Sequence, residues 1–181
     1  VAAAHFLQDV ELQLKCTAFL QNQISVGNVL TILEARNRLE IDDQLITACT
    51  TFVRMNGDAV LQSESFTTLT EGDVVKIISD EHLHADEEKV FEAVLSWNKA
   101  AVARGQGSTL ILNNMLSYLR LAEMDHVFLS NRVKDAGVLS NDVIIAAMAT
   151  MLDTRPKRAF DGESSFQKPA KKHCRHRIGY A

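Results

Sequence analysis

The sequence contains little proline and glycine. Of its 181 residues, two are proline (Pro156 and Pro169) and eight are glycine. Both residue types interrupt helices, so their scarcity before Pro156 predicts helices joined by short connections. No apolar run approaches the ~20 residues of a membrane-spanning helix. Val1–Leu7 is too short, and lacks the basic start, for a secretory signal. We therefore expect no contact with a membrane.

Cysteine is scarce as well. Cys16, Cys49 and Cys174 are odd in number and irregularly spaced, which favours reduced thiols over a disulfide framework. Cys16 and Cys49 fall on apolar helix faces, where a thiol acts as a small hydrophobic side chain. We therefore expect a cytoplasmic protein, with the nucleus as the alternative location.

The sequence motifs of common enzymes are absent. There is no glycine-rich phosphate loop, G-x-S-x-G, H-E-x-x-H or C-x-x-C. His82-x-His84 and His173-Cys174-Arg175-His176 have the composition of metal ligands, but neither implies a complete, rigid ligand set. A polar loop is the simpler interpretation of the first, and a flexible tail of the second. We expect no enzymatic activity, no cofactor and no metal.

Charge divides the chain into two parts. From Thr154 onward, eight basic residues face two acidic ones, a charge of +6, so the remainder carries −10 of the total of −4. Residues 154–181 also lack periodic apolar positions, which predicts an irregular basic tail. A solvated linker is the main interpretation. Contact with nucleic-acid phosphates or a nuclear-import signal are the alternatives.

The stretch from Leu83 to Trp97 organises the rest of the chain. Val90, Phe91, Val94, Leu95 and Trp97 share one broad helical face, which Ala101 and Val102 extend. Asp86 stands at the expected start and Gly105 at the expected stop. Because Trp and Phe bury large areas, neighbouring helices should pack around this one.

Capping residues and apolar spacing predict further helices on both sides. Their expected starts are Asp9, Ser25, Asp42, Ser63, Thr70 and Ser108, a point near Glu123, and Ser140. The apolar side of the helix after Asp9 would consist of Val10, Leu14, Cys16, Phe19, Leu20 and Ile24, and that after Ser108 would include Leu110. Val74–Ile78 is the best candidate for a strand, although the capping signal at Thr70 favours a helix. The expected fold is therefore all-α, with about 8–10 helices in stacked antiparallel hairpins.

One motif carries a family resemblance. Val90-Phe91-Glu92-Ala93-Val94-Leu95, with Leu83 before it and Trp97 after it, resembles the signature of the BACK domain. That domain is the helical region between the BTB and Kelch domains of cullin-3 ubiquitin-ligase adaptors. Shorter pieces agree in order and spacing: Cys16–Leu20, Asn28–Leu30, Phe66 with Leu69, and Tyr118–Leu121. Ala122 replaces a common proline, residues 126–153 match poorly, and no Kelch repeat or BTB body is present.

The resemblance implies a non-catalytic scaffold that spaces a substrate-recognition domain from a BTB domain in a cullin-3 ligase. Residues 1–8 would end a BTB-like domain, 9–153 would form the BACK-like domain, and 154–181 would lead toward a C-terminal domain. Cullin-3 and substrate would bind through the full-length protein, and a homodimer would need the BTB domain. The alternatives are a helical interaction scaffold without a cullin role, or nucleic-acid association through the tail.

The resemblance also implies a partner surface on the first hairpin. Phe19, Gln23, Ile24 and Leu30 are the residues that we expect to line a protein-binding groove there, unless all four are internal. The expected structural core comprises Phe52, Leu83, Val90, Phe91, Val94, Leu95 and Trp97.

Overall fold

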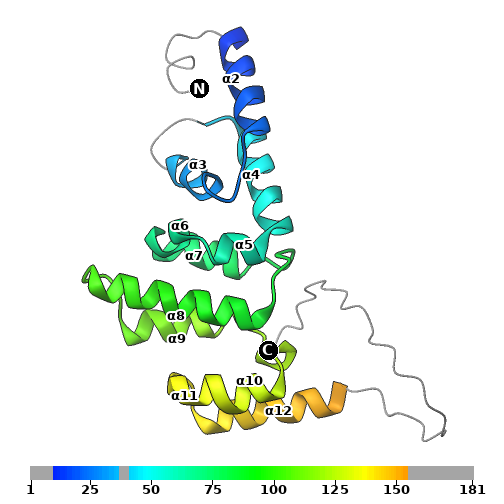
Figure 1. Cartoon of the computed structure of the whole chain (residues 1–181), viewed down its shortest axis with the longest axis vertical. Helices are drawn as coiled ribbons and strands as arrows, with labels where there is room; N and C mark the ends of the chain where they lie inside the picture. The colour runs from blue at the N-terminus through cyan, green and yellow to red at the C-terminus, as the bar shows by residue number, and fades with distance from the viewer. Residues whose placement is uncertain (1–9, 37–40, 155–181) are drawn as a thin grey trace, which may run out of the picture.

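The structure is a computed structural model that describes residues 10–36 and 41–154 (Figure 1). Helices make up about three quarters of these two ranges, and no strand occurs in them. They are α2 (Val10–Asn22), α3 (Val29–Ala35), α4 (Asp43–Met55), α5 (Gly57–Leu61), α6 (Glu64–Thr68), α7 (Glu71–Ile78), α8 (Glu87–Ala103), α9 (Thr109–Leu116), η1 (Leu121–Glu123), α10 (His126–Phe128), η2 (Leu129–Val133), α11 (Lys134–Ala136) and α12 (Asn141–Thr154). The predicted BTB-like end at 1–8 and the basic tail after Thr154 lie outside the described residues.

The helices form layers that follow the order of the chain. Figure 1 shows α2 to α4 at one end, then α5 to α7, then the α8–α9 hairpin, and α10 to α12 at the other end. α4 contacts both α2 and α3, whereas α8 contacts α5, α6 and α9. The predicted all-α stack of helical hairpins is therefore confirmed, with α8 near its middle.

Side-chain caps fix several helix starts. Asp42 accepts a hydrogen bond from the Gln44 amide (2.7 Å) at the start of α4. Thr70 accepts one from the Asp73 amide (3.3 Å) at the start of α7, which is a helix through Ile78 rather than the alternative strand. Ser108 accepts one from the Ile111 amide (3.2 Å) at the start of α9. These three predicted starts are confirmed, because each cap satisfies an amide that the helix itself cannot.

The core is built around one face of α8. Leu83, Val90, Phe91, Val94 and Trp97 are each at most 2% exposed, and Phe52 and Leu95 are half-buried against the same core. The Trp97 indole donates a hydrogen bond to the Leu69 carbonyl (2.9 Å), which binds α8 to the end of α6. The Phe91 ring meets the Phe128 ring edge to face, with centroids 5.9 Å apart. α8 therefore holds the layers on both of its sides.

Some apolar residues that we expected to face inward are exposed. On α2, Leu14 is 56% and Phe19 64% exposed, since α4 is the main packing partner of α2 among the described helices and leaves these side chains uncovered. Val102 (54%) and Leu110 (82%) lie beside the turn from α8 to α9, beyond the packed part of the hairpin. The spacing of apolar residues was therefore a poor guide at the outer layer and at the hairpin tip.

Two helix starts differ from the prediction. α3 begins at Val29 and not after Ser25, because residues 26–28 form a turn. The helix expected near Glu123 begins after Asp125, which caps it by accepting from the Val127 amide (2.8 Å). It runs through α10, the π-helical η2 and α11 to Gly137. A π segment holds an extra residue in a turn, and the spacing of apolar residues gave no sign of it.

Gly57 allows the second layer to approach α8. A Cβ atom at this position would lie 2.5 Å from the His84 carbonyl oxygen and 2.9 Å from the Leu83 side chain. Asn56-Gly57 therefore does more than separate α4 from α5, since the chain leading into α8 crosses directly over this glycine.

Candidate protein-interaction surfaces

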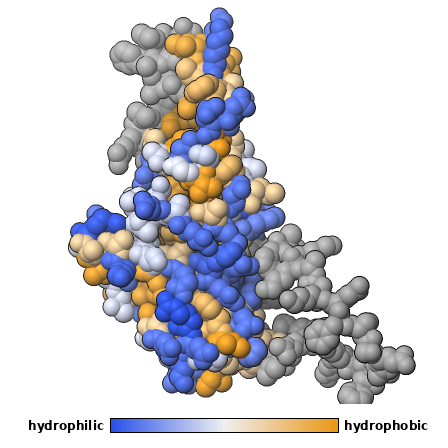
Figure 2. Space-filling model, viewed as in Figure 1, coloured by the Kyte–Doolittle hydropathy of each residue, from blue (hydrophilic) through white to orange (hydrophobic). Residues whose placement is uncertain are grey.

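An apolar stripe lies exposed on α2. Leu12, Cys16 and Phe19 are spaced i, i+4, i+7 and so share one helix face. Leu12 is 42% and Phe19 64% exposed, and Cys16 is half-buried. Figure 2 shows hydrophobic residues gathered over α2, α3 and α4, with a mostly hydrophilic surface over the layers below. An exposed apolar patch of this kind marks a candidate surface for a protein partner.

The turn after α2 is held by one asparagine. Asn28 accepts a hydrogen bond from the Ser25 amide (2.9 Å), and its own amide group donates to the Gln23 carbonyl (2.8 Å). The following Val29 and Leu30 are at most 1% exposed. This arrangement gives a physical reason for an asparagine followed by two aliphatic residues, because the polar side chain closes the turn while the next two fix α3 in the core.

The four predicted partner residues do not share one surface. Phe19 and Gln23 are both exposed and lie one turn apart, while Ile24, just after α2, is half-buried against the core. Leu30 is 1% exposed and lines a partly open cavity between α3, α4 and α7. Their role in binding a partner stays a prediction. The exposed Leu12, which the prediction did not include, extends the surface around Phe19.

One buried and one exposed ion pair join α8 to the last layer. Glu87 is 5% exposed, and its carboxylate receives the Arg120 guanidinium (2.5 Å) and the Arg120 amide (3.3 Å). Further along α8, the Glu92 carboxylate accepts two hydrogen bonds from the guanidinium of Arg132 in η2 (2.6 and 2.8 Å). The hydrogen bond to Glu92 and the charge of that carboxylate raise the pKa of Arg132. Such forked contacts fix direction as well as distance.

A second set of contacts joins α8 to the layer before it. The Asp58 carboxylate on α5 accepts from the Asp86 amide (2.9 Å) and from the Lys89 ammonium. The hydrogen bond that Lys89 donates to Asp58 raises the pKa of Lys89. Asp86 stands at the N-cap of α8 as predicted, but its side chain makes no capping hydrogen bond and instead lies 3.2 Å from Lys89.

The sequence held a signal for the buried pair that our reading missed. Glu87, Phe91 and Val94 are spaced i, i+4, i+7, so a carboxylate shares the most apolar face of α8. An acidic residue in the first turn of a helix also has a simpler interpretation, because the helix dipole favours negative charge there. A charged residue within an apolar face predicts a buried ion pair, although its partner Arg120 is 33 residues away and only the fold brings the two together.

The histidines near α8 stand in a loop. The His82 imidazole lies 3.5 Å from Asp80, and the His84 amide donates to the Arg54 carbonyl (2.8 Å). Within residues 10–36 and 41–154, no group of three or more His, Cys, Asp or Glu is placed to hold a metal ion. His173-Cys174-Arg175-His176 lies outside these ranges. No helix in the described part of the chain has the length and apolar character needed to span a bilayer.

Comparison with known proteins identifies the family. Residues 29–134 match the family described as BACK, BTB And C-terminal Kelch. The chain belongs to the BACK family. Kelch-like protein 28 of Mus musculus and that of Homo sapiens are each 37% identical to it over 142 residues. The aligned part is 77% of this chain and 24% of each relative, so the chain spans about a quarter of their length.

The BACK match confirms the resemblance that the α8 motif indicated. It ends at residue 134, so it includes the first nine of residues 126–153 and leaves the others unmatched. The match and the Kelch-like relatives associate the chain with the BTB–BACK–Kelch adaptor family, whose members are scaffolds rather than enzymes. Two features of this BACK chain can serve such a scaffold: a stack of layers bonded to one another through α8, and an exposed apolar surface on α2.

Proposed function

We propose that this chain is the rigid spacer of a BTB–BACK adaptor in a cullin-3 ubiquitin ligase. In this role it holds a substrate-recognition domain at a fixed distance and direction from the BTB domain, without catalysing a reaction. The observation that carries the proposal is the bonding of α8 on both sides, to Asp58 in the layer before it and to Arg120 and Arg132 after it. We further propose that the protein acts in the cytoplasm.

The exposed stripe on α2 supports a direct contribution to cullin-3 binding. Leu12 and Phe19 present apolar surface at the end of the stack that lies nearest to the expected BTB domain. Aromatic side chains at the centre of an interface often dominate its binding energy. Phe19 is therefore the residue whose loss should weaken cullin-3 binding most.

Binding of cullin-3 by the full-length parent protein tests this proposal. We expect Phe19→Ser to weaken the affinity for purified cullin-3 by roughly tenfold or more. Leu110→Ser is the matched control, because Leu110 is also exposed (82%) but lies at the α8–α9 tip. Failure of the unaltered parent protein to bind cullin-3 would contradict the ligase role and leave the helical scaffold without a cullin role. Equal affinities for the two variants would contradict the role of the α2 stripe alone.

A further inference from the structure

A cavity of about 540 Å³ lies between α3, α4 and α7, on the inner side of the first layer. Six aliphatic side chains make up its apolar lining: Leu30, Leu33, Val53, Leu69, Ile77 and Leu83. Cavities of about 300–1,000 Å³ with such a lining are the usual size for a ligand or an anchoring side chain. The volume is therefore sufficient for a large apolar group. The charged residues at the rim then determine which polar or charged group can bind beside it.

The two half-buried carboxylates at the rim are already satisfied. These are Asp73 and Asp80, and each of their four oxygen atoms accepts a hydrogen bond. The donors are the Thr70 hydroxyl (2.7 Å), the Lys76 ammonium (3.1 Å), the Arg54 guanidinium (2.7 Å) and the His82 amide (2.9 Å). An incoming cation would have to compete with Lys76 and Arg54 for these oxygen atoms.

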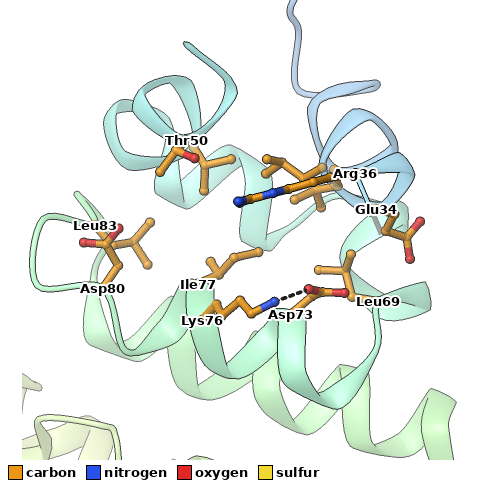
Figure 3. Close-up of a pocket in the computed structure, with 12 residues that line it drawn as sticks. Glu34, Arg36, Thr50, Leu69, Asp73, Lys76, Ile77, Asp80 and Leu83 are labelled. Atoms are coloured by element: carbon orange, nitrogen blue, oxygen red, sulfur yellow. Dashed lines mark hydrogen bonds and ion pairs between the residues drawn. The ribbon is translucent and has the colours of Figure 1, made fainter. Parts of the chain in front are cut away.

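Unused hydrogen-bond donors remain at the cavity. Arg36, at the end of α3, extends its guanidinium across the cavity opposite Ile77 (Figure 3). Among the residues that the structure describes, Arg36 makes no ion pair, and a guanidinium has five N–H groups to donate. Lys76 uses one N–H on Asp73 and has two more. Glu34 is also at the rim, but its carboxylate points away from the cavity in Figure 3.

We propose that this cavity binds a segment of a partner protein in which a large apolar side chain stands beside an aspartate or glutamate. The apolar side chain fills the cavity, and the carboxylate accepts hydrogen bonds from Arg36 and Lys76. A guanidinium is well suited to this role, because it donates two parallel hydrogen bonds to one carboxylate. The assignment rests on the proposed adaptor role, and it adds a binding site separate from the α2 stripe.

Charge argues against the chain's own basic tail as the occupant. The segment after Thr154 carries eight basic and two acidic residues. If one of its aromatic side chains entered the cavity, the neighbouring lysine and arginine residues would come close to Arg36, and their like charges would repel. The acidic residues of a partner segment would instead be attracted to Arg36.

A matched pair of dyes tests the chemistry of the cavity in the full chain. The anion 8-anilinonaphthalene-1-sulfonate and the neutral N-phenyl-1-naphthylamine share the same rings and differ by the sulfonate. We expect Arg36→Gln to weaken binding of the anionic dye about tenfold and to leave the neutral dye unchanged. Glu34→Gln, the matched control at the same rim, should not weaken either dye. Equal loss for both dyes, or no loss with Arg36→Gln, would overturn the assignment.

Selection from a displayed library of random peptides identifies the partner chemistry. With the unaltered chain as bait, we expect enrichment of sequences that place a large apolar residue next to Asp or Glu. Their binding should be lost with Arg36→Gln and retained with Glu34→Gln. Enrichment of basic peptides, or binding of the dyes without any peptide selected, would overturn the proposal of a protein segment. Because the selection uses no cullin-3, its failure is distinguishable from a failure of the ligase role.

Discussion

Trp97 gives the sharpest test of α8 as the centre of the stack. Its side chain is 2% exposed, and its indole donates to the Leu69 carbonyl at 2.9 Å. An aromatic side chain of this kind buries about 150–250 Å², which at about 25 cal/mol per Å² is roughly 4–6 kcal/mol. Large-to-small substitutions of buried aromatic residues cost about 3–5 kcal/mol. We therefore expect Trp97→Ala to lower the free energy of unfolding by about 3–5 kcal/mol.

A second substitution at Trp97 isolates the hydrogen bond. Trp97→Phe keeps most of the ring but leaves the carbonyl of Leu69, itself a buried residue, without its donor. We expect a loss of about 1–3 kcal/mol, the cost of an unsatisfied buried polar group. The total free energy of unfolding of such a domain is only about 5–15 kcal/mol, so Trp97→Ala can prevent folding. In that case Trp97→Phe still tests the place of Trp97.

Urea unfolding followed by far-ultraviolet circular dichroism measures both losses, because that signal does not depend on the tryptophan that is removed. Leu110→Ala is the control: Leu110 is 82% exposed, and we expect a change within about 0.5 kcal/mol. A loss below about 1 kcal/mol for Trp97→Ala would refute the central place of α8. A loss for Trp97→Phe no larger than that of the control would refute the role of the hydrogen bond to Leu69.

Three further predictions concern the contacts around α8. Gly57→Ala should lower the free energy of unfolding by about 1–3 kcal/mol in the same assay, because the new Cβ would lie 2.5 Å from the His84 carbonyl oxygen. An unchanged free energy of unfolding would show that the layers can separate freely. Arg120→Met should cost about 3–5 kcal/mol by leaving Glu87 buried and unpaired, and Glu87→Leu in the same chain should recover most of that loss; a double variant as unstable as the single one would contradict the pairing. Burial raises the pKa of Asp80. The hydrogen bonds from the Arg54 side chain and the His82 amide, together with the charges of the Arg54 and His82 side chains, outweigh burial and hold the pKa below its ordinary value of 3.8. The stability that Asp80 contributes should therefore be complete above about pH 5 and be lost as the pH falls through the folded-state pKa, so the difference in urea midpoint between wild type and Asp80→Asn should shrink only under acidic conditions. A difference that shrinks at alkaline pH instead would contradict this sign.

Local signals in the sequence were sufficient for the helices that begin with a side-chain cap. Asp42, Thr70 and Ser108 each act as predicted, because a cap depends only on residues two or three positions away. The apolar face of α8 was also predictable, since helical spacing alone brings Val90, Phe91 and Val94 together.

What the sequence did not predict depends on distant contacts. Leu14 and Phe19 match a buried helical face in their spacing, yet no element among those described covers them. The Glu87–Arg120 pair and the cavity at Arg36 join residues from separate layers. The π segment at Leu129–Val133 places Arg132 against Glu92, and no property of Leu129-Ser130-Asn131 distinguishes it from an ordinary helical turn. The spacing of apolar residues along a helix therefore predicted which helix faces are buried in the core. Which apolar faces stay exposed in the outer layers could be learned only from the packed structure.

If the chain is a rigid spacer, the distance between its two ends must be fixed. Spin labels at Ala18→Cys on α2 and Ala149→Cys on α12 report this distance, because both positions are exposed. Cys16 and Cys174 are replaced by serine, and Cys49 can remain since it is fully buried and inaccessible to the label. Pulsed electron paramagnetic resonance should then give one narrow distance distribution. A broad distribution, or two separate distances, would contradict a rigid stack organised around α8.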